Sequence, residues 1–167
     1  MFYANSASDA SDYVTNLAKD RGVKSVVKSK SMISEEMSLN HHLEIQGIES
    51  VETDLGEFII QLDHDAPSHI VQPMIHKDRR AVGRAFEREL GTEYCEDATS
   101  LARVARKHLR EKFRQADLGI SGGNFLIAES GSVVICTNEG NGRLCTSAPR
   151  VHAVSYTHLT LPTSDLV

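Results

Sequence analysis

The stretch Ser25-Val-Val-Lys-Ser-Lys-Ser-Met-Ile-Ser-Glu-Glu36 decides the fold of this chain. Its first three residues form a short apolar run, which is typical of a buried strand. A helix is predicted to begin at Ser34, because Glu35 and Glu36 would then lie in its first turn, where the helix dipole favours acids. A strand followed directly by a helix indicates a βαβ unit and a parallel sheet.

The segments on either side continue this alternation. Ser6-Ala-Ser-Asp9 resembles a capping box, and the apolar residues at positions 10, 13, 14, 17 and 18 follow it at helical spacing. Gly22 stands where a helix would end, before the strand at Ser25. On the other side Gly47 ends the second helix, and Glu49–Asp54 is predicted to be the next strand.

The rest of the chain alternates in the same way. Gly56–Leu62 fits a helix or a strand, and the other assignments are a loop over Asp63–Ser68, strands over His69–Met74, Asp117–Ser121 and Ser132–Thr137, and helices over Lys77–Leu90 and Ala98–Ala116. Strands that alternate with helices of this length predict an α/β fold, with a mostly parallel sheet flanked by helices.

Length and charge exclude several classes of protein. A chain of 167 residues is of the size of one domain, and no apolar run approaches the ~20 residues of a membrane helix. The start of the chain has no secretory signal, so we expect a cytoplasmic protein without a membrane span. The net charge is −5, which argues against nonspecific binding to nucleic acid. The basic segment Arg103–Arg114 is interpreted as the solvated face of an amphipathic helix.

Cysteine and histidine give no cofactor signature. Cys95, Cys136 and Cys145 are odd in number and widely spaced, so neither a disulfide framework nor a zinc or iron–sulfur site is encoded in these residues. The eight histidines match no zinc spacing, and we expect no metal site. His69 and His76 are interpreted as polar anchors at strand ends.

The end of the chain differs in composition from the rest. Val154-Ser-Tyr-Thr-His-Leu-Thr-Leu-Pro-Thr163 carries no charge, and it looks like the translation of a transposon-type sequencing adapter. We therefore expect a partial domain over residues 1–153 and a non-native tail over residues 154–167. Residues 155–167 are expected to contribute nothing to the core.

The first candidate site is Lys28-Ser-Lys-Ser-Met32, which follows a strand and precedes a helix. Strand-end amides, hydroxyls and two ammonium groups make an anion cradle there. The alternative is that Ser31 or Ser34 caps the helix while both lysines are solvated.

The second candidate is Leu118-Gly-Ile-Ser-Gly-Gly-Asn-Phe125, again at the end of a strand. The paired glycines allow either a close approach of the backbone to a ligand or a simple turn. The pattern is not that of a dinucleotide-binding loop.

The third candidate runs from Ala128 to Arg143. Asn141-Gly142 predicts a hairpin turn, which explains the glycines but not Asn138 and Glu139. Glu129 or Glu139 could serve as a nucleophile or general base toward an acyl substrate, and Arg143 could clamp a carboxylate.

Parallel strands bring their carboxyl ends to one edge of a sheet, and ligands bind there. We expect these segments to form a pocket for a small anionic ligand at that edge, and its residues are Lys28, Ser29, Lys30, Glu52, Asp54, Gly122, Asn124, Asn138, Glu139 and Arg143.

Five segments in order resemble the lactate-utilisation protein B family. They are Val26-Val-Lys-Ser-Lys-Ser-Met-Ile-Ser-Glu-Glu-Met37, Val51-Glu-Thr-Asp-Leu-Gly-Glu-Phe-Ile-Ile-Gln-Leu62, Pro67-Ser-His-Ile-Val71, Ala116-Asp-Leu-Gly-Ile-Ser-Gly-Gly-Asn-Phe125 and Thr137-Asn-Glu-Gly-Asn-Gly-Arg143. The resemblance runs from Phe2 to Ala153. It implies a LUD domain, incomplete here, of the ribose-5-phosphate isomerase and CoA-transferase superfamily.

The resemblance also implies a function. Members of the family are iron–sulfur, electron-transfer subunits of a cytoplasmic oxidoreductase complex that oxidises L-lactate to pyruvate together with two partner proteins. Their [4Fe-4S] clusters lie in a ferredoxin-like region after the LUD domain. This chain lacks the C-x-x-C-x-x-C-x-x-x-C-P run, so we expect no cofactor in this fragment and no electron transfer by it alone.

Two alternatives stay open beside the electron-transfer subunit. One is an enzyme that acts on an acyl or sugar-phosphate substrate, with Glu129 or Glu139 as the reacting carboxylate. The other is a non-catalytic scaffold that docks partner subunits. Because segments that would complete the sheet are expected to be missing, the fragment is predicted to be poorly stable and inactive.

Overall fold

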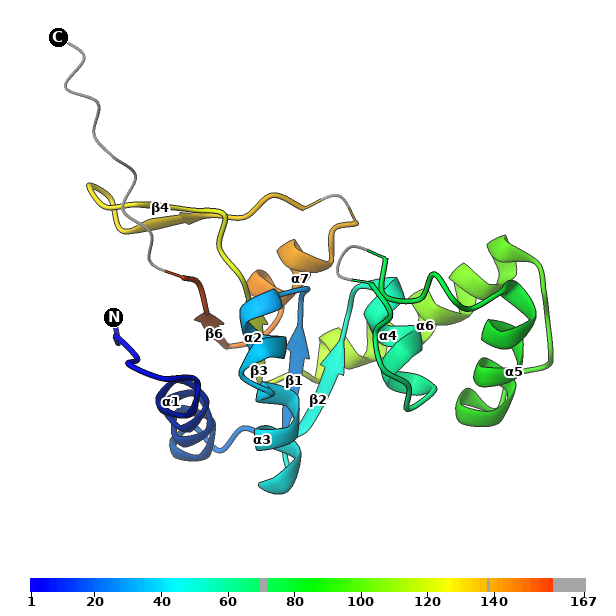
Figure 1. Ribbon diagram of the computed structural model, residues 1–167, viewed down its shortest axis with the longest axis horizontal. Helices are drawn as coiled ribbons and strands as arrows, with labels where there is room; N and C mark the ends of the chain where they lie inside the picture. Colours follow the sequence, from blue (N-terminus) through cyan, green and yellow to red (C-terminus); the bar gives the residue numbers. More distant parts are fainter. Residues whose placement is uncertain (70–71, 138, 158–167) are drawn as a thin grey trace, which may run out of the picture.

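A four-stranded parallel sheet forms the centre of the molecule. The computed structural model describes residues 1–69, 72–137 and 139–157 (Figure 1). The sheet has the order β2-β1-β3-β6, formed by β1 (Ser25–Lys28), β2 (Glu49–Glu52), β3 (Leu118–Ser121) and β6 (Val151–Val154). All three strand pairings are parallel, so the four carboxyl ends lie along one edge.

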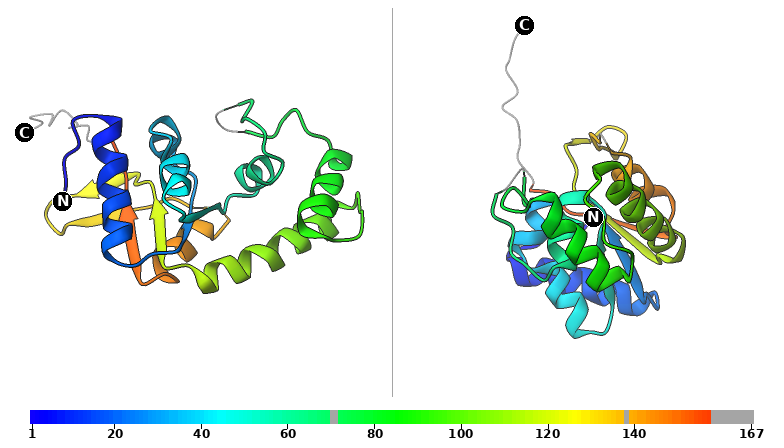
Figure 2. Two further views of the ribbon diagram at one scale, coloured as in Figure 1. Left: turned by 90° about the horizontal axis from the view of Figure 1, so that it is seen from below. Right: turned by 90° about the vertical axis from the view of Figure 1, so that its right-hand side faces the viewer.

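The helices cover both faces of the sheet, as the alternating pattern predicts. They are α1 (Ala7–Asp20), α2 (Met32–Glu36), α3 (Leu39–Ile45), α4 (Leu55–Leu62), α5 (Arg79–Leu90), α6 (Ala98–Gln115) and α7 (Asn141–Ser147). Figure 2 shows α6 running from the sheet outward to α5. The α/β class with a parallel sheet is thus confirmed.

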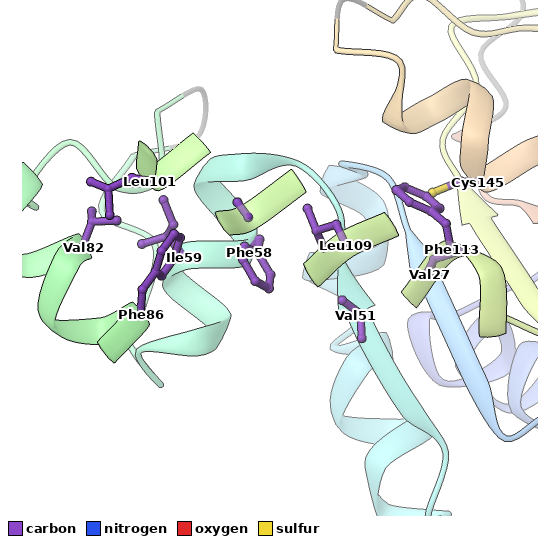
Figure 3. Close-up of a cluster of buried hydrophobic side chains, with 11 residues drawn as sticks. Val27, Val51, Phe58, Ile59, Val82, Phe86, Leu101, Leu109, Phe113 and Cys145 are labelled. Atoms are coloured by element: carbon purple, nitrogen blue, oxygen red, sulfur yellow. The ribbon is translucent and has the colours of Figure 1, made fainter. Parts of the chain in front are cut away.

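The core has two halves because successive side chains of a strand point to opposite faces. Val26 packs with α1 and α3 on one face, next to Leu118 and Ile120 of β3. Val27 and Val51 point to the other face. There they join a cluster that extends through Phe58 of α4 to α5 and α6 (Figure 3). The long helices α5 and α6 each bury an apolar face in this cluster, and burial of apolar surface is the main driving force for packing the layers.

Two segments near the middle of the chain differ from the prediction. The strand over His69–Met74 is wrong for its described residues, because His69 lies in a bend and residues 73–76 form turns; residues 70 and 71 lie outside the described part. Pro73 within that run opposes a strand, because proline cannot donate to a ladder. The helix predicted from Ser34 is divided into α2 and α3, because Ser38 adopts a left-handed φ of 52°. The ambiguous stretch after Asp54 is helical, as α4.

The region after β3 departs most from the prediction. Ser132–Thr137 does not extend the parallel sheet. Among the described strands, β5 (Ser132–Val134) pairs with β4 (Phe125–Ile127) alone, in a separate antiparallel ribbon. Asn141-Gly142 is not a hairpin turn but the start of α7, because the chain already reverses at Gly140, whose φ is 81°. The sequence analysis also missed β6, which includes Val154, the first residue assigned there to a non-native tail.

Candidate functional site

A hollow of about 580 Å³ opens at the carboxyl edge of the sheet. Three of the predicted segments line it: the loop after β1, the loop after β3 and the segment that leads into α7. Among its lining residues are Ser29, Lys30, Ser31, Asp54, Gly122, Gly123, Asn124, Cys136, Thr137, Asn141 and Gly142. The structure therefore places five predicted site residues around one cavity: Ser29, Lys30, Asp54, Gly122 and Asn124.

Lys28 and Glu52 lie below this hollow instead of in it. The ammonium of Lys28 is 2.7 Å from Glu52 Oε1, and the two side chains are 0% and 6% exposed. Lys28 also donates to Ser34 Oγ at 2.8 Å, and Asn40 Nδ2 donates to Glu52 Oε1 at 2.7 Å. This buried network joins the ends of β1 and β2 to α2 and α3, so it holds the rim in place.

Ser31 caps α2, as the structural alternative for this segment predicts. Its Oγ accepts from Ser34 N at 3.4 Å. The other part of that alternative, two solvated lysines, is wrong for Lys28 because its side chain is fully buried.

Lys30 lies on the wall of the hollow. Its ammonium is 2.5 Å from Glu57 Oε1, and its side chain is 29% exposed, against 7% for Glu57. The sequence analysis missed Glu57. A signal was present, since Glu57 follows Asp54 by three residues at the start of a helix, and that spacing puts two side chains on one face.

Asp54 and Glu57 share a proton-binding role. Burial, a hydrogen bond with Glu57 and the charges of Glu57 and Glu139 raise the pKa of Asp54 to about 7, and the charge of Lys30 opposes this. Burial would also raise the pKa of Glu57, but hydrogen bonds from Asp54 and Lys30 outweigh burial and lower it. The carboxyl of Asp54 is therefore protonated in about half of the molecules at neutral pH and in most of them below it, while that of Glu57 is charged.

Asn124 is held in place from the opposite side of the hollow. Its backbone N–H donates to Val134 O at 2.9 Å, and its Oδ1 accepts from Cys136 N at 2.7 Å. The side chain is thereby fixed between β3 and the ribbon strand β5. Because Oδ1 is already used as an acceptor, the amide NH₂ is the group that can donate to a ligand.

The remaining predicted residues lie elsewhere. Glu139 lines a neighbouring groove and acts on Asp54 through its charge. Arg143 lines a separate hollow of about 510 Å³ together with Thr137 and His152. Glu129 is exposed in the turn between β4 and β5. Asn138 lies outside the described residues.

The cysteines do not come together in a way that fits an iron–sulfur cluster. Cys145 is buried under β3, and burial raises the pKa of its thiol to about 11 despite a contact of 3.4 Å with Thr53 Oγ1. Cys95 precedes α6 and Cys136 follows β5. Within the ranges that the structure describes, no three His, Cys, Asp or Glu side chains are arranged to hold a metal ion. None of the helices described is long and apolar enough to cross a bilayer.

Comparison with known proteins gives one family. The family model for the LUD domain matches residues 1–156. A protein of Escherichia coli K12 described as an uncharacterized electron transport protein, YkgF, is 46% identical over 152 residues. Lactate utilization protein B is 47% identical over 150 residues in Bacillus cytotoxicus and 50% identical over 151 residues in Geobacillus thermodenitrificans. Each alignment covers 90% or 91% of this chain but 32% of the relative. No solved structure matches the chain.

Proposed function

Because this chain belongs to the LUD domain family, we propose that it acts in lactate utilisation, as the LUD portion of an electron-transfer protein in a cytoplasmic complex that oxidises L-lactate to pyruvate. The observation that supports this most is the 50% identity over 151 residues to a lactate utilization protein B. The electron-transport description of the Escherichia coli relative points in the same direction.

The proposal assigns the redox groups to other parts of the protein. Iron–sulfur clusters need converging cysteine thiolates, and Cys145 is buried with its thiol protonated at neutral pH. The chain spans about a third of the length of the curated relatives. We assign [4Fe-4S] clusters and contacts with other subunits to the full-length protein, and no step of electron transfer to the residues described here.

The hollow at the carboxyl edge is proposed to bind a small hydroxy- or keto-carboxylate. Lys30 supplies a cation on its wall, and Asn124 supplies an amide donor. The Asp54–Glu57 pair gains or loses one proton near neutral pH, because the pKa of Asp54 is about 7, so it can donate to, or accept from, a ligand hydroxyl. These residues therefore bind and orient an anion and exchange a proton with it.

A hybrid protein tests the function. The 151 aligned residues of this chain replace the matching third of the Geobacillus thermodenitrificans lactate utilization protein B, in a host that lacks its own copy. We expect the hybrid to restore growth on L-lactate to the level given by the unaltered relative. Full-length hybrid protein at normal abundance that leaves growth on L-lactate absent would overturn the proposal.

A further inference from the structure

A groove of about 920 Å³ lies between α6 and α7, beside the hollow described above. Its floor is apolar and includes Leu109 and Phe113 of α6. Leu144 of α7 also lines it and is 45% exposed. Leu55 of α4 borders the groove as well and is 37% exposed, so exposed apolar side chains of two helices lie beside a floor that belongs to the core.

Three arginines form one side of this groove. Arg106, Arg110 and Arg114 recur every four residues along α6, so they lie in one stripe of the helix. Within the described part of the chain, the one ion pair of Arg114 is a long one of 3.6 Å with Glu111 on its own helix. Among the described residues, Arg106 and Arg110 form no ion pair. The interpretation of this segment as the solvated face of an amphipathic helix is confirmed, because its arginines are exposed while Leu109 and Phe113 are buried. The stripe of arginines also borders the groove.

The pattern of charge defines the chemistry of what binds there. An apolar floor with three arginines on one side, of which only Arg114 has an ion pair among the described residues, fits an amphipathic segment that has an apolar face flanked by carboxylates. Arginine is well suited to such pairing because its planar guanidinium binds a carboxylate through two hydrogen bonds. Glu139 lines the groove as well. Its carboxylate favours a basic residue at the point where the bound segment passes it.

The length of the relatives indicates where this segment comes from. About two thirds of each relative lies outside the part that matches this chain, since each alignment covers 32% of the relative. A segment that is tethered in the same polypeptide has a high effective concentration at the groove, so it remains bound even if the interface is small. We propose that the arginine groove receives an acidic amphipathic segment from that remaining length of the family's polypeptide. The inference rests on the family assignment and does not depend on lactate as the substrate.

Hydrogen exchange of the hybrid protein and of the present chain provides the first test. Each rate for α6 and α7 is divided by the rate for α5 in the same protein, so that a difference in global stability cancels. If the groove is covered within the hybrid, these ratios are at least about ten-fold lower there than in the chain alone. Equal exchange of α6 and α7 in the two proteins overturns the proposal. Protection of α6 and α7 that appears only after a partner protein is added also overturns the proposal and identifies that protein as the occupant. Protection that appears only when the chain dimerises overturns it too and identifies a second copy as the occupant.

Charge reversal provides the second test. Arg106→Glu with Arg110→Glu in the hybrid is expected to remove the added protection of α7. The matched control is Arg103→Glu with Lys107→Glu, which makes the same charge change on α6 at two positions outside the groove. Loss of protection in both variants, or in neither, contradicts the assignment. Growth on L-lactate is read separately, so failure of this inference is distinguishable from failure of the proposed function.

Discussion

Lys28 ends β1 with its ammonium enclosed by protein on every side. Removing a charge from water is costly, and only a close partner with further hydrogen bonds offsets this. Glu52, Ser34 and Asn40 provide both. The rim of the hollow therefore depends on a buried charge that does not touch the cavity.

Replacing Lys28 by Met is expected to lower the free energy of unfolding by about 3–5 kcal/mol, because Glu52 is left as an uncompensated buried charge. Urea denaturation measures this loss. The exposed pair Lys112–Glu49, 2.6 Å apart, supplies the control: Lys112→Met should cost less than about 1 kcal/mol. Removing both charges, with Lys28→Met and Glu52→Leu, should recover part of the stability. Similar losses for Lys28→Met and Lys112→Met would show that the buried pair is not important.

Asp54 predicts an unusual dependence of stability on pH. Its pKa in the folded protein, about 7, is above the ordinary value of 3.8, so the folded state binds a proton that the unfolded state has already released. Stability from this group is therefore fully present below about pH 4 and falls as the pH rises toward 7.

The Asp54→Asn variant should gain stability relative to the parent between pH 5 and pH 7, because it removes the carboxyl that is costly to ionise. Urea midpoints of both proteins across this range give the difference. Asp12→Asn, which removes an exposed carboxylate of α1, is the control. A difference between Asp54→Asn and the parent that stays constant with pH would contradict the assigned pKa.

At the scale of elements, α7 packs closely against β3 because β3 has a glycine, Gly119, at the point of contact. A Cβ placed on Gly119 would lie 1.8 Å from the carbonyl oxygen of Cys145. Only glycine allows the helix backbone to approach the strand so closely. This contact positions the start of α7, with Asn141 and Gly142, against the hollow.

Gly119→Ala is expected to destabilise the fold by about 3 kcal/mol or more, because backbone must move to relieve the overlap. Thermal and urea unfolding measure the effect. Gly122→Ala is the matched control, since its nearest neighbour, Ser31 Oγ, would be 3.7 Å away, an ordinary contact. It should cost less than about 1 kcal/mol. Equal stability of the two variants would show that α7 does not need the close approach.

The elements that could be predicted are those with a strong local signal. The cap at Ser6 is confirmed, since its side chain accepts from Asp9 N, and the apolar run at Val26 predicts β1 correctly. The start of α7 could not be predicted, because Asn141-Gly142 is typical of a hairpin turn and no neighbouring residue in the sequence indicates a helix instead. Its helical state depends on packing of Cys145 against β3, which is a long-range contact.

At the scale of the whole molecule, parallel pairing is what made a candidate site predictable. The order β2-β1-β3-β6 brings the loops after β1 and β3 together, as the rule for parallel sheets implies. Which lysine faces the cavity could not be predicted, because Lys28 and Lys30 lie two residues apart near the end of one strand. Burial by α2 and α3, a tertiary effect, encloses Lys28 and leaves Lys30 at the rim.

The central claim is that the hollow at the carboxyl edge is where this protein acts, and Lys30 tests it most directly. The measurement is the rate of L-lactate oxidation in cells that carry the hybrid with Lys30→Met, beside the hybrid with Lys112→Met. Loss of a charged contact to a bound anion predicts that the rate per folded hybrid protein falls at least about ten-fold for Lys30→Met and does not fall for Lys112→Met. The amount of folded protein is measured for each variant, because Lys30→Met also leaves the buried carboxylate of Glu57 without its cation. Oxidation by the Lys30→Met hybrid at the parental rate would contradict the claim.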